Sequence, residues 1–231
     1  MLNSEIIEKI WHDVYKNQTP QDNPQGFVLG GQPGAGKSSL IEKIKNQLQD
    51  NVIVINGDDY RRYHPQYAEL QEKYGKDSVN KTADFAAKMT ESILQKAING
   101  RFNIVIEGTF RTSETPIKTL KLFKDNGYKT HILIQTCNKS ISSTSCNERY
   151  EKMRNIMPNE ARYTPKDKHD IVCENLAKNI NEVYLSGFTD SLKIFIRNDI
   201  AGLKIEKFFD STLDSNLDIE KLEKIINDKI I

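Results

Sequence analysis

FVLGGQPGAGKSS, residues 27–39, is the stretch of the sequence that decides the fold. From Gly31 to Ser38 it matches the phosphate-binding pattern GxxxxGK[ST], and it lies between a short apolar run and a helix-compatible segment, which is the setting that the pattern requires. Glycines allow the backbone to curl with its N–H groups pointing inward, and the helix that follows adds the positive end of its dipole. We therefore expect a P-loop that binds the phosphates of a nucleoside triphosphate.

Each part of this loop has an expected role. Lys37 is expected to reach the β- and γ-phosphates of ATP, and the Ser38 hydroxyl is expected to bind Mg²⁺. The alternative is a glycine-rich turn that merely resembles the motif. The residues expected to bind the nucleotide are Gly31, Gln32, Pro33, Gly34, Ala35, Gly36, Lys37, Ser38 and Ser39.

Strand-like and helix-like segments alternate along the chain on both sides of this loop. The expected strands, rich in β-branched residues, are 27–29, 52–55, 103–106, 131–134 and 192–196. The expected helices are 38–48, 82–98, 116–126 and 166–184, with amphipathic segments also at each end of the chain. This order predicts an α/β P-loop kinase fold, in which a mostly parallel sheet of about five strands carries helices on both faces. We expect one domain over residues 1–231.

Two regions do not fit the alternation. Residues 59–81 are aromatic and polar without clean periodicity, and residues 138–165 are polar with Arg149, Arg154 and Arg162 spread along them. Long segments of this kind serve as lids or binding loops, or are plain surface excursions. We expect a lid at 138–165, whose arginines would stabilise the charge of a transferred phosphoryl group, although any single arginine there also fits a solvated face.

The composition excludes several classes of partner. Lysine and arginine number 33 against 32 aspartates and glutamates, so no overall positive field favours nucleic acid. The three cysteines lack paired spacing, which favours a reduced compartment. No apolar run approaches the ~20 residues of a membrane span, and no export signal is visible, so we expect a cytoplasmic location.

Carboxylates follow two of the expected strands, on the rim where open α/β sheets bind ligands. Asp58 follows the strand at 52–55 and can accept a proton from an acceptor hydroxyl as a general base, or orient that hydroxyl. It can equally, with Asp59, simply cap the next segment. The strand at 103–106 is followed by Glu107, Thr109 and Arg111, which would bind substrate hydroxyls and a phosphate unless they form an ordinary polar loop.

Six motifs together resemble the zeta toxin family, and they occur in the family's order from about residue 27 to residue 176. They are GQPGAGKSS from Gly31, INGDDYRRYHP from Ile55, KMTESI from Lys88, VIEGTFRT from Val105, ERYE from Glu148 and ARYTPKDKHDIV from Ala161. The resemblance implies a P-loop kinase of a toxin-antitoxin system. Such kinases transfer the γ-phosphate of ATP to the 3′-hydroxyl of the amino sugar of UDP-N-acetylglucosamine, which impairs peptidoglycan precursor synthesis, and a small antitoxin protein neutralises them.

Carried over to this sequence, the resemblance assigns roles residue by residue. It makes Lys37 the phosphate lysine, Ser38 the magnesium ligand and Asp58 the base, with Arg149 and Arg162 as the lid arginines. The implied sugar-nucleotide pocket contains Glu91, Glu107, Thr109 and Arg111, although helical periodicity alone makes Glu91 a solvated residue.

Two residues depart from the pattern that we expect of the family. Asp59 places a second carboxylate beside Asp58, and Phe110 is bulky and is expected to narrow the pocket. The sequence therefore defines the type of reaction more closely than it defines the acceptor substrate. Two alternatives stay open: a P-loop phosphotransferase for another small hydroxyl acceptor such as an antibiotic, and a nucleotide-gated regulatory protein.

Overall fold

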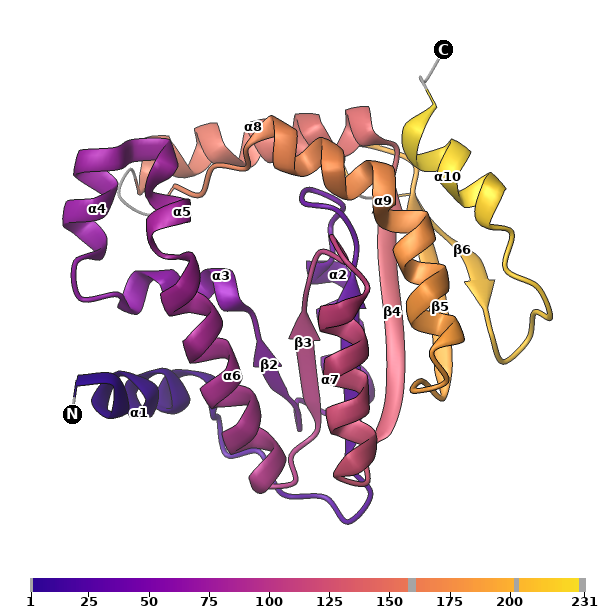
Figure 1. The fold of residues 1–231 in the computed structure, drawn as a ribbon, viewed down its shortest axis with the longest axis horizontal. Helices are drawn as coiled ribbons and strands as arrows, with labels where there is room; N and C mark the ends of the chain where they lie inside the picture. Colours follow the sequence, from indigo (N-terminus) through magenta and orange to yellow (C-terminus); the bar gives the residue numbers. More distant parts are fainter. Residues whose placement is uncertain (1, 158–160, 202–203, 229–231) are drawn as a thin grey trace.

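The computed structural model describes residues 2–157, 161–201 and 204–228. Their strands form one six-stranded sheet (Figure 1). The strand order is β2-β3-β1-β4-β5-β6, in which every neighbouring pair is parallel except β5 and β6. The strands are β1 (Gln25–Gly30), β2 (Ile53–Ile55), β3 (Ile104–Glu107), β4 (Lys129–Cys137), β5 (Ser191–Arg197) and β6 (Ile205–Asp210).

Helices follow most of the strands. They are α1 (Leu2–Val14), α2 (Ser38–Gln47), α3 (Gly57–Tyr60), α4 (Tyr67–Tyr74), α5 (Ser78–Lys81), α6 (Ala83–Asn99), α7 (Glu114–Asp125), α8 (Lys139–Ile156), α9 (Lys166–Leu185) and α10 (Ile219–Asn227), with short 3₁₀ turns η1 (Arg61–Tyr63) and η2 (Gly75–Asp77). Across the described parts of the chain, no helix combines the length and the apolar character that crossing a bilayer demands.

The two faces of the sheet carry separate cores because successive side chains of a strand point to opposite sides. Phe27 and Leu29 of β1 pack with Leu40 and Ile44 of α2 on one face. Val28, between them, faces a larger core that includes buried residues of α6, α7, α9 and α10. The prediction of a parallel sheet with helices on both faces is confirmed.

The sheet has one strand more than the five predicted. β6 is an antiparallel edge strand, and its first three residues are exposed or half-buried. An edge strand of this kind lacks the continuous apolar run by which the buried parallel strands were found. Its sequence, IEKFFD, therefore gave no clear signal beside the five stronger runs.

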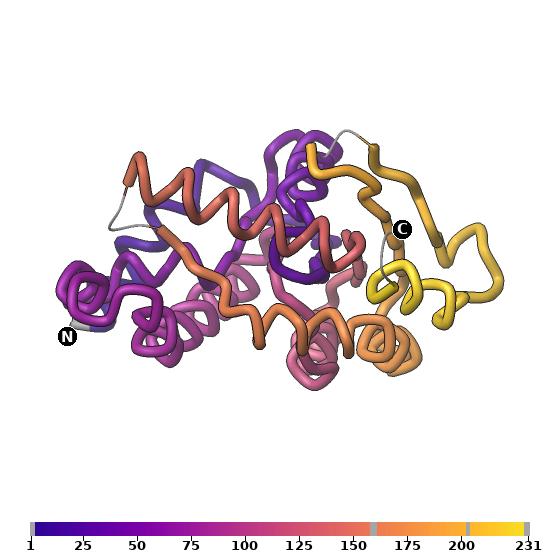
Figure 2. The backbone as a smooth tube through the Cα atoms, turned by 90° about the horizontal axis from the view of Figure 1, so that it is seen from above, coloured from indigo at the N-terminus to yellow at the C-terminus, as the bar shows by residue number. Residues whose placement is uncertain are grey.

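The segment expected as a lid is largely helical. Asn138 caps α8 by accepting a hydrogen bond from the backbone N–H of Ser140, and the helix continues for 18 residues to Ile156. Residues 158–160 lie outside the described part, and residues 161–165 lead into α9. Seen from above (Figure 2), α8 and α9 pass on either side of the P-loop at the carboxyl ends of the strands. The buried residues of α8, Ile141, Ser142 and Cys146, all lie in its first half. The sequence of α8 therefore shows no apolar stripe along its whole length.

The region 59–81, also without clean periodicity, folds as a chain of short turns. It contains the second half of α3, then η1, α4, η2 and α5, and the longest of these has eight residues. These elements reach toward the far end of α8 (Figure 1), where the Lys76 ammonium lies over the rings of Tyr150 and Tyr163. Such short helices cannot show the repeated apolar spacing that identifies an amphipathic helix.

One histidine is held neutral inside the sheet layer. The His131 ring on β4 stacks on Phe27 at 4.8 Å between centroids, and its Nδ1 lies 2.8 Å from the Ser191 hydroxyl. Its Nε2 is buried and has no hydrogen-bond partner among the described residues. Burial, reinforced by the nearby Lys129, lowers the pKa of His131 to about 4. Protonation of this ring therefore opposes folding.

This histidine predicts an acid-sensitive fold. In the unfolded chain the imidazole has a pKa near 6.5, so between about pH 6.5 and pH 4 the unfolded state binds a proton that the folded state does not. The free energy of unfolding therefore decreases as the pH is lowered through this window, by at most about 1.4 kcal/mol per pH unit. His131→Gln should flatten this slope in chemical denaturation at a series of pH values. His12→Gln, at a side chain that is 89% exposed, is the control and should leave the slope unchanged. A wild-type stability that is constant from pH 6.5 to 4 would contradict the prediction.

Candidate active site at the phosphate-binding loop

The P-loop is packed so closely on its neighbours that glycine is required at two points. Gly31 has φ +136°, and a Cβ added there would lie 1.9 Å from the carbonyl oxygen of Gln135. Gly34 has φ +79°, and its Cβ would lie 2.2 Å from the carbonyl oxygen of Ser142. Both conformations are strained for residues with side chains, so the glycines set the loop against the end of β4 and the start of α8.

Side chains behind the loop fix its shape. The Gln135 amide donates to the carbonyl of Ala35 at 3.1 Å and accepts from the Ser39 hydroxyl at 2.8 Å. The buried Gln32 amide donates to the carbonyl of Cys137 and accepts from the Thr136 hydroxyl. The side chains of Gln32 and Ser39, both predicted to bind nucleotide, are therefore engaged with β4 and support the loop from behind.

The loop lysine is buried and already neutralised in part. Lys37 Nζ donates to the carbonyl oxygens of Gly31 at 2.9 Å and Gln32 at 3.2 Å, and it lies 3.6 Å from Glu107 Oε1. Glu107 in turn accepts a hydrogen bond from the Asn56 amide at 3.1 Å. Neutral carbonyls hold an ammonium less strongly than charged oxygens do, so a phosphate can replace them. Lys37 is thus placed to bind an anion that enters the loop.

Asp58 lies across the same cavity at the start of α3. The Asn56 side chain caps this short helix by accepting from the backbone N–H of Asp58. The Asp58 carboxylate accepts from Arg61 Nε at 2.9 Å, and 60% of its side chain is exposed. Arg61 is itself anchored to the carbonyl of Val79 and the hydroxyl of Thr82. One carboxylate oxygen is therefore oriented by an arginine while the group stays open to a ligand.

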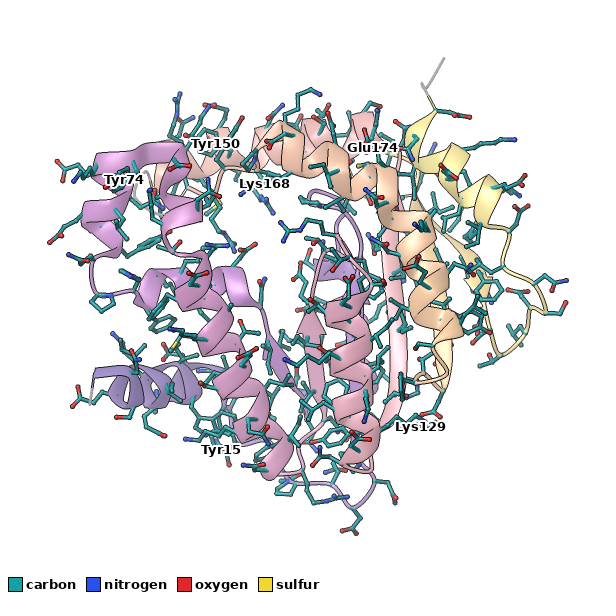
Figure 3. The ribbon with its side chains drawn as sticks, viewed as in Figure 1. Tyr15, Tyr74, Lys129, Tyr150, Lys168 and Glu174 are labelled. Atoms are coloured by element: carbon teal, nitrogen blue, oxygen red, sulfur yellow. The ribbon has the colours of Figure 1, made fainter. Side chains whose placement is uncertain are left out.

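These groups line one cavity of about 690 Å³, a volume typical of small-molecule sites. Its described lining includes seven lysine and arginine side chains and two carboxylates, although the whole chain carries a net charge of only +1. Lys168, at the beginning of α9, is one of these cations (Figure 3). The cationic residues are Lys37, Arg61, Arg111, Arg149, Arg162, Lys168 and Arg197, and the acidic residues are Asp58 and Glu107. This local excess of positive charge favours a strongly anionic ligand.

The loop side of the cavity is formed by Pro33, Gly34, Gly36, Lys37 and Ser38. Ser38 is the first residue of α2 and is exposed. The described residues contain no cluster of three acidic, histidine or cysteine side chains that could hold a metal by themselves. One hydroxyl beside a phosphate-binding loop is nevertheless a suitable donor for Mg²⁺, which commonly takes most of its ligands from phosphates and water.

The two arginines that were predicted to belong to a lid, Arg149 and Arg162, line the cavity from α8 and from the segment that follows it. Arg162 donates to Asp59 Oδ1 at 2.8 Å, so the segment after α8 is joined to α3 across 103 residues of sequence. Arg149 Nη2 makes a long contact of 3.4 Å with the Thr164 hydroxyl. The third arginine of the segment, Arg154, pairs with Glu151 on α8 and is not part of the cavity lining. The extra carboxylate of Asp59 therefore serves as the partner of Arg162.

Comparison with known proteins identifies the family. The zeta toxin family profile matches residues 9–226 of this chain. The chain belongs to the zeta toxin family. It is 40% identical to Toxin PezT of Streptococcus pneumoniae serotype 4 over 175 residues, 76% of this chain and 69% of that protein. It is 37% identical to Toxin zeta of Streptococcus pyogenes over 218 residues, which cover 94% and 74% of the two chains.

A solved structure shares the fold of this zeta toxin family member. It comes from a characterisation of the PezAT chromosomal toxin-antitoxin system of Streptococcus pneumoniae. The superposition has a TM-score of 0.85 at 30% identity and covers 97% of this chain and 87% of the other. The resemblance inferred from the six motifs is thereby confirmed.

The zeta-family pocket residues differ in where the structure places them. Glu107, Thr109 and Arg111 line the cavity together with Asp58. Glu91 is not among the described lining residues: its side chain is 74% exposed and lies 3.9 Å from Lys118 on α7. The solvated position that helical periodicity indicated for Glu91 is the one observed.

Phe110 does not narrow the pocket, so that expectation was wrong. Its ring is buried, with 3% exposed, and a Cβ on Gly30 would meet it at 2.5 Å. The residue adopts φ +55°, and the amide of Asn179 on α9 donates to the carbonyls of Phe110 and Arg111. The turned backbone sends the aromatic ring into the core and leaves its two neighbours, Thr109 and Arg111, on the cavity.

Three cavity cations were not predicted from the sequence. Arg61, Lys168 and Arg197 line the site, and each stands in a stretch where a charged residue is unremarkable. Arg61 is part of the INGDDYRRYHP motif. Its spacing of three residues from Asp58 on a helical turn could have predicted that the two side chains pair. Arg197 ends β5 on the same rim as the other ligand-facing residues, so its position on the strand was the signal for it.

The Arg162–Asp59 ion pair is expected to restrain the segment 161–165, and hydrogen exchange can measure this restraint. Asp59→Asn should speed hydrogen exchange in the segment 161–165, at the four backbone amides of residues 161–164, because the link from that segment to α3 is lost. Both side chains are partly exposed, at 32% and 48%, so the pair is worth at most about 1 kcal/mol and the melting temperature should fall by less than about 4 °C.

The matched control is Glu151→Gln, which breaks the exposed 3.0 Å pair with Arg154 within α8. This change should leave exchange at 161–165 as in the wild type. Equal exchange in Asp59→Asn and wild type would show that the ion pair does not restrain the segment.

Proposed function

We propose that this chain is an ATP-dependent kinase toxin that phosphorylates the 3′-hydroxyl of the amino sugar of UDP-N-acetylglucosamine. The observation that carries the proposal is the cavity in which Lys37 and Asp58 face a common space lined by seven cations. A triphosphate donor and a diphosphate-linked acceptor together need such an excess of positive charge. Membership of the zeta toxin family supports the same reading.

On the donor side, the P-loop would hold ATP. Backbone N–H groups at the start of α2 and the Lys37 ammonium would bind the phosphates, with Lys37 exchanging its loop carbonyls for phosphate oxygens. Ser38 would hold Mg²⁺, which when bound would supply positive charge against the phosphate oxygens.

On the acceptor side, Asp58 would take the proton of the attacking hydroxyl. A bond forms between that oxygen and the γ-phosphorus, the bond from the γ-phosphorus to the bridging oxygen breaks, and ADP leaves. Arg61 keeps one oxygen of Asp58 engaged at 2.9 Å, so the other can face the acceptor. Glu107, Thr109 and Arg111 on the β3 side would position the sugar nucleotide, with Arg111 suited to its diphosphate.

The segment at 138–165 would act as the lid of a single kinase domain spanning residues 1–231. Its arginines Arg149 and Arg162 reach the cavity from the wall opposite the sheet, where they can stabilise the transferred phosphoryl group. Closure over the ligands would exclude water, which otherwise competes with the sugar hydroxyl. Glu91, although the family pattern includes it, would reach the acceptor only if this part of α6 moves on binding.

The proposed substrates place the protein in the cytoplasm, where a small antitoxin would restrain it. The structural relative belongs to the PezAT toxin-antitoxin system, which supports an antitoxin partner for this chain. Three buried free cysteines are compatible with a reducing compartment.

The proposal predicts a specific product and a specific inactive variant. Wild-type protein with Mg-ATP and UDP-N-acetylglucosamine should yield a sugar nucleotide heavier by one phosphate in mass spectrometry. Asp58→Asn should slow this transfer by roughly 10²–10⁴-fold, because a general base acts mainly in the transition state. Its affinity for Mg-ATP in calorimetry should stay within about threefold of the wild type, since Asp58 acts on the acceptor.

Asp125→Asn is the control, because this carboxylate is exposed at the end of α7 and pairs only locally with Lys121. It should retain full activity. Wild-type transfer to other hydroxyl acceptors but not to this sugar nucleotide would reassign the substrate. An Asp58→Asn variant that transfers at the wild-type rate would exclude Asp58 as the base.

A further inference from the structure

A buried arginine beside the P-loop has no acidic partner among the residues that the structure describes. Arg197 is the last residue of β5, and only 5% of it is exposed. Its Nη2 donates to the carbonyl of Gly34 at 2.8 Å and the hydroxyl of Ser145 at 3.0 Å, and it lies 3.6 Å from the Cys137 sulfur. All three partners are neutral oxygen or sulfur atoms, and two of them belong to the loop or to the helix beside it.

The other cationic side chains of the cavity have a carboxylate nearby or are more accessible to water. Lys37, Arg61 and Arg162 each lie within 4 Å of a carboxylate. Arg111 and Arg149 are exposed, so water solvates their charge, and Lys168 is half-buried and donates to the side-chain oxygen of Asn80. Among the described residues that line the cavity, Arg197 is therefore the cation that is both buried and without a carboxylate within ion-pair distance.

The guanidinium also has unused hydrogen-bonding capacity. Its Nε is buried and has no partner among the described residues. Its Nη1 lies 3.6 Å from the position that a Cβ of Gly36 would occupy, so this nitrogen approaches the loop where the glycine leaves the backbone bare. Burial of a cation without a counter-charge is costly, and such groups in native proteins have a partner. Nη1 is thus the nitrogen that approaches the part of the loop that would receive phosphate, while Nε, behind it in the side chain, is left without a partner.

We propose that Arg197 is a nucleotide-binding residue whose missing counter-charge is the phosphate chain of the bound nucleotide. The proposal rests on the proposed binding of ATP by the P-loop. Arg197 approaches from the β5 side and Lys37 from within the loop, so two cations of different origin meet the same anion. Its hydrogen bond to Gly34 also fixes the loop carbonyl away from the phosphate.

Arg197→Gln distinguishes the effect of the positive charge on nucleotide binding from the effect of the hydrogen bond that holds the loop. The glutamine amide keeps a donor for the Gly34 carbonyl but removes the positive charge. We expect the affinity for Mg-ATP, measured by calorimetry, to fall roughly 10–100-fold, as for the loss of a hydrogen bond to a charged group. The melting temperature without nucleotide should equal or exceed that of the wild type, because an uncompensated buried charge has been removed.

Two further variants complete the test. Arg197→Lys keeps the charge and should bind Mg-ATP within about tenfold of the wild type, so it carries the test if Arg197→Gln does not fold. Lys129→Met removes a cation at the amino end of β4, far from the loop (Figure 3), and should leave the affinity unchanged. No binding of Mg-ATP by the wild type would refute the proposed function itself.

Binding by the wild type with equal affinity in Arg197→Gln would refute only the role of Arg197. Two other outcomes would also overturn that role. In the first, nucleotide-free Arg197→Gln melts well below the wild type, which would make Arg197 a support for the loop. In the second, Arg197→Lys binds as weakly as Arg197→Gln.

Discussion

The close packing of the P-loop on the carboxyl end of β4 is the constraint on which the site depends. The Gln135 carbonyl lies where a side chain of Gly31 would be, and the Gln135 amide holds Ala35 and Ser39. This packing turns the loop so that Lys37 is buried beneath it. The platform is β4, the parallel strand next to β1, together with the start of α8, which meets Gly34. The positions of Gly31 and Gly34 therefore depend on the strand order.

Around this loop the protein concentrates positive charge that the chain as a whole does not carry. Arg61 comes from η1 and pairs with Asp58, and Arg162 comes from the segment after α8 and pairs with the next residue, Asp59. The two neighbouring carboxylates therefore have different tasks in the structure: Asp58 faces the cavity with one arginine, and Asp59 joins the two walls. Arg197 differs from Arg61 and Arg162, because it is buried against the loop and has no carboxylate partner among the described residues. The site is built for anions before any ligand enters.

The sequence revealed the parts of this arrangement that depend on local pattern. Apolar runs identified the five parallel strands, and the loop motif placed Lys37 and Ser38, since both signals lie within a few residues. β6 was missed because an exposed edge strand has little apolar pattern, and α8 was read as irregular because only part of it is buried. The inward turn of Phe110 depends on hydrogen bonds from the distant Asn179, and the contact of Arg197 with Gly34 also joins distant segments. No local pattern encodes these contacts, although the end of the β5 strand did indicate the rim position of Arg197. Family resemblance suggested Glu91 for the pocket, whereas its own helical periodicity indicated the exposed position that it occupies.

The central claim is that Lys37 and Asp58 act on opposite sides of one phosphoryl group. A crystal structure with Mg²⁺, a non-hydrolysable ATP analogue and UDP-N-acetylglucosamine tests it most directly. The account predicts that Lys37 Nζ leaves the carbonyls of Gly31 and Gln32 for the phosphates, and that a carboxylate oxygen of Asp58 lies about 2.6–3.2 Å from the acceptor hydroxyl. A triphosphate bound away from the glycine loop, or an acceptor hydroxyl beyond the reach of Asp58, would contradict it.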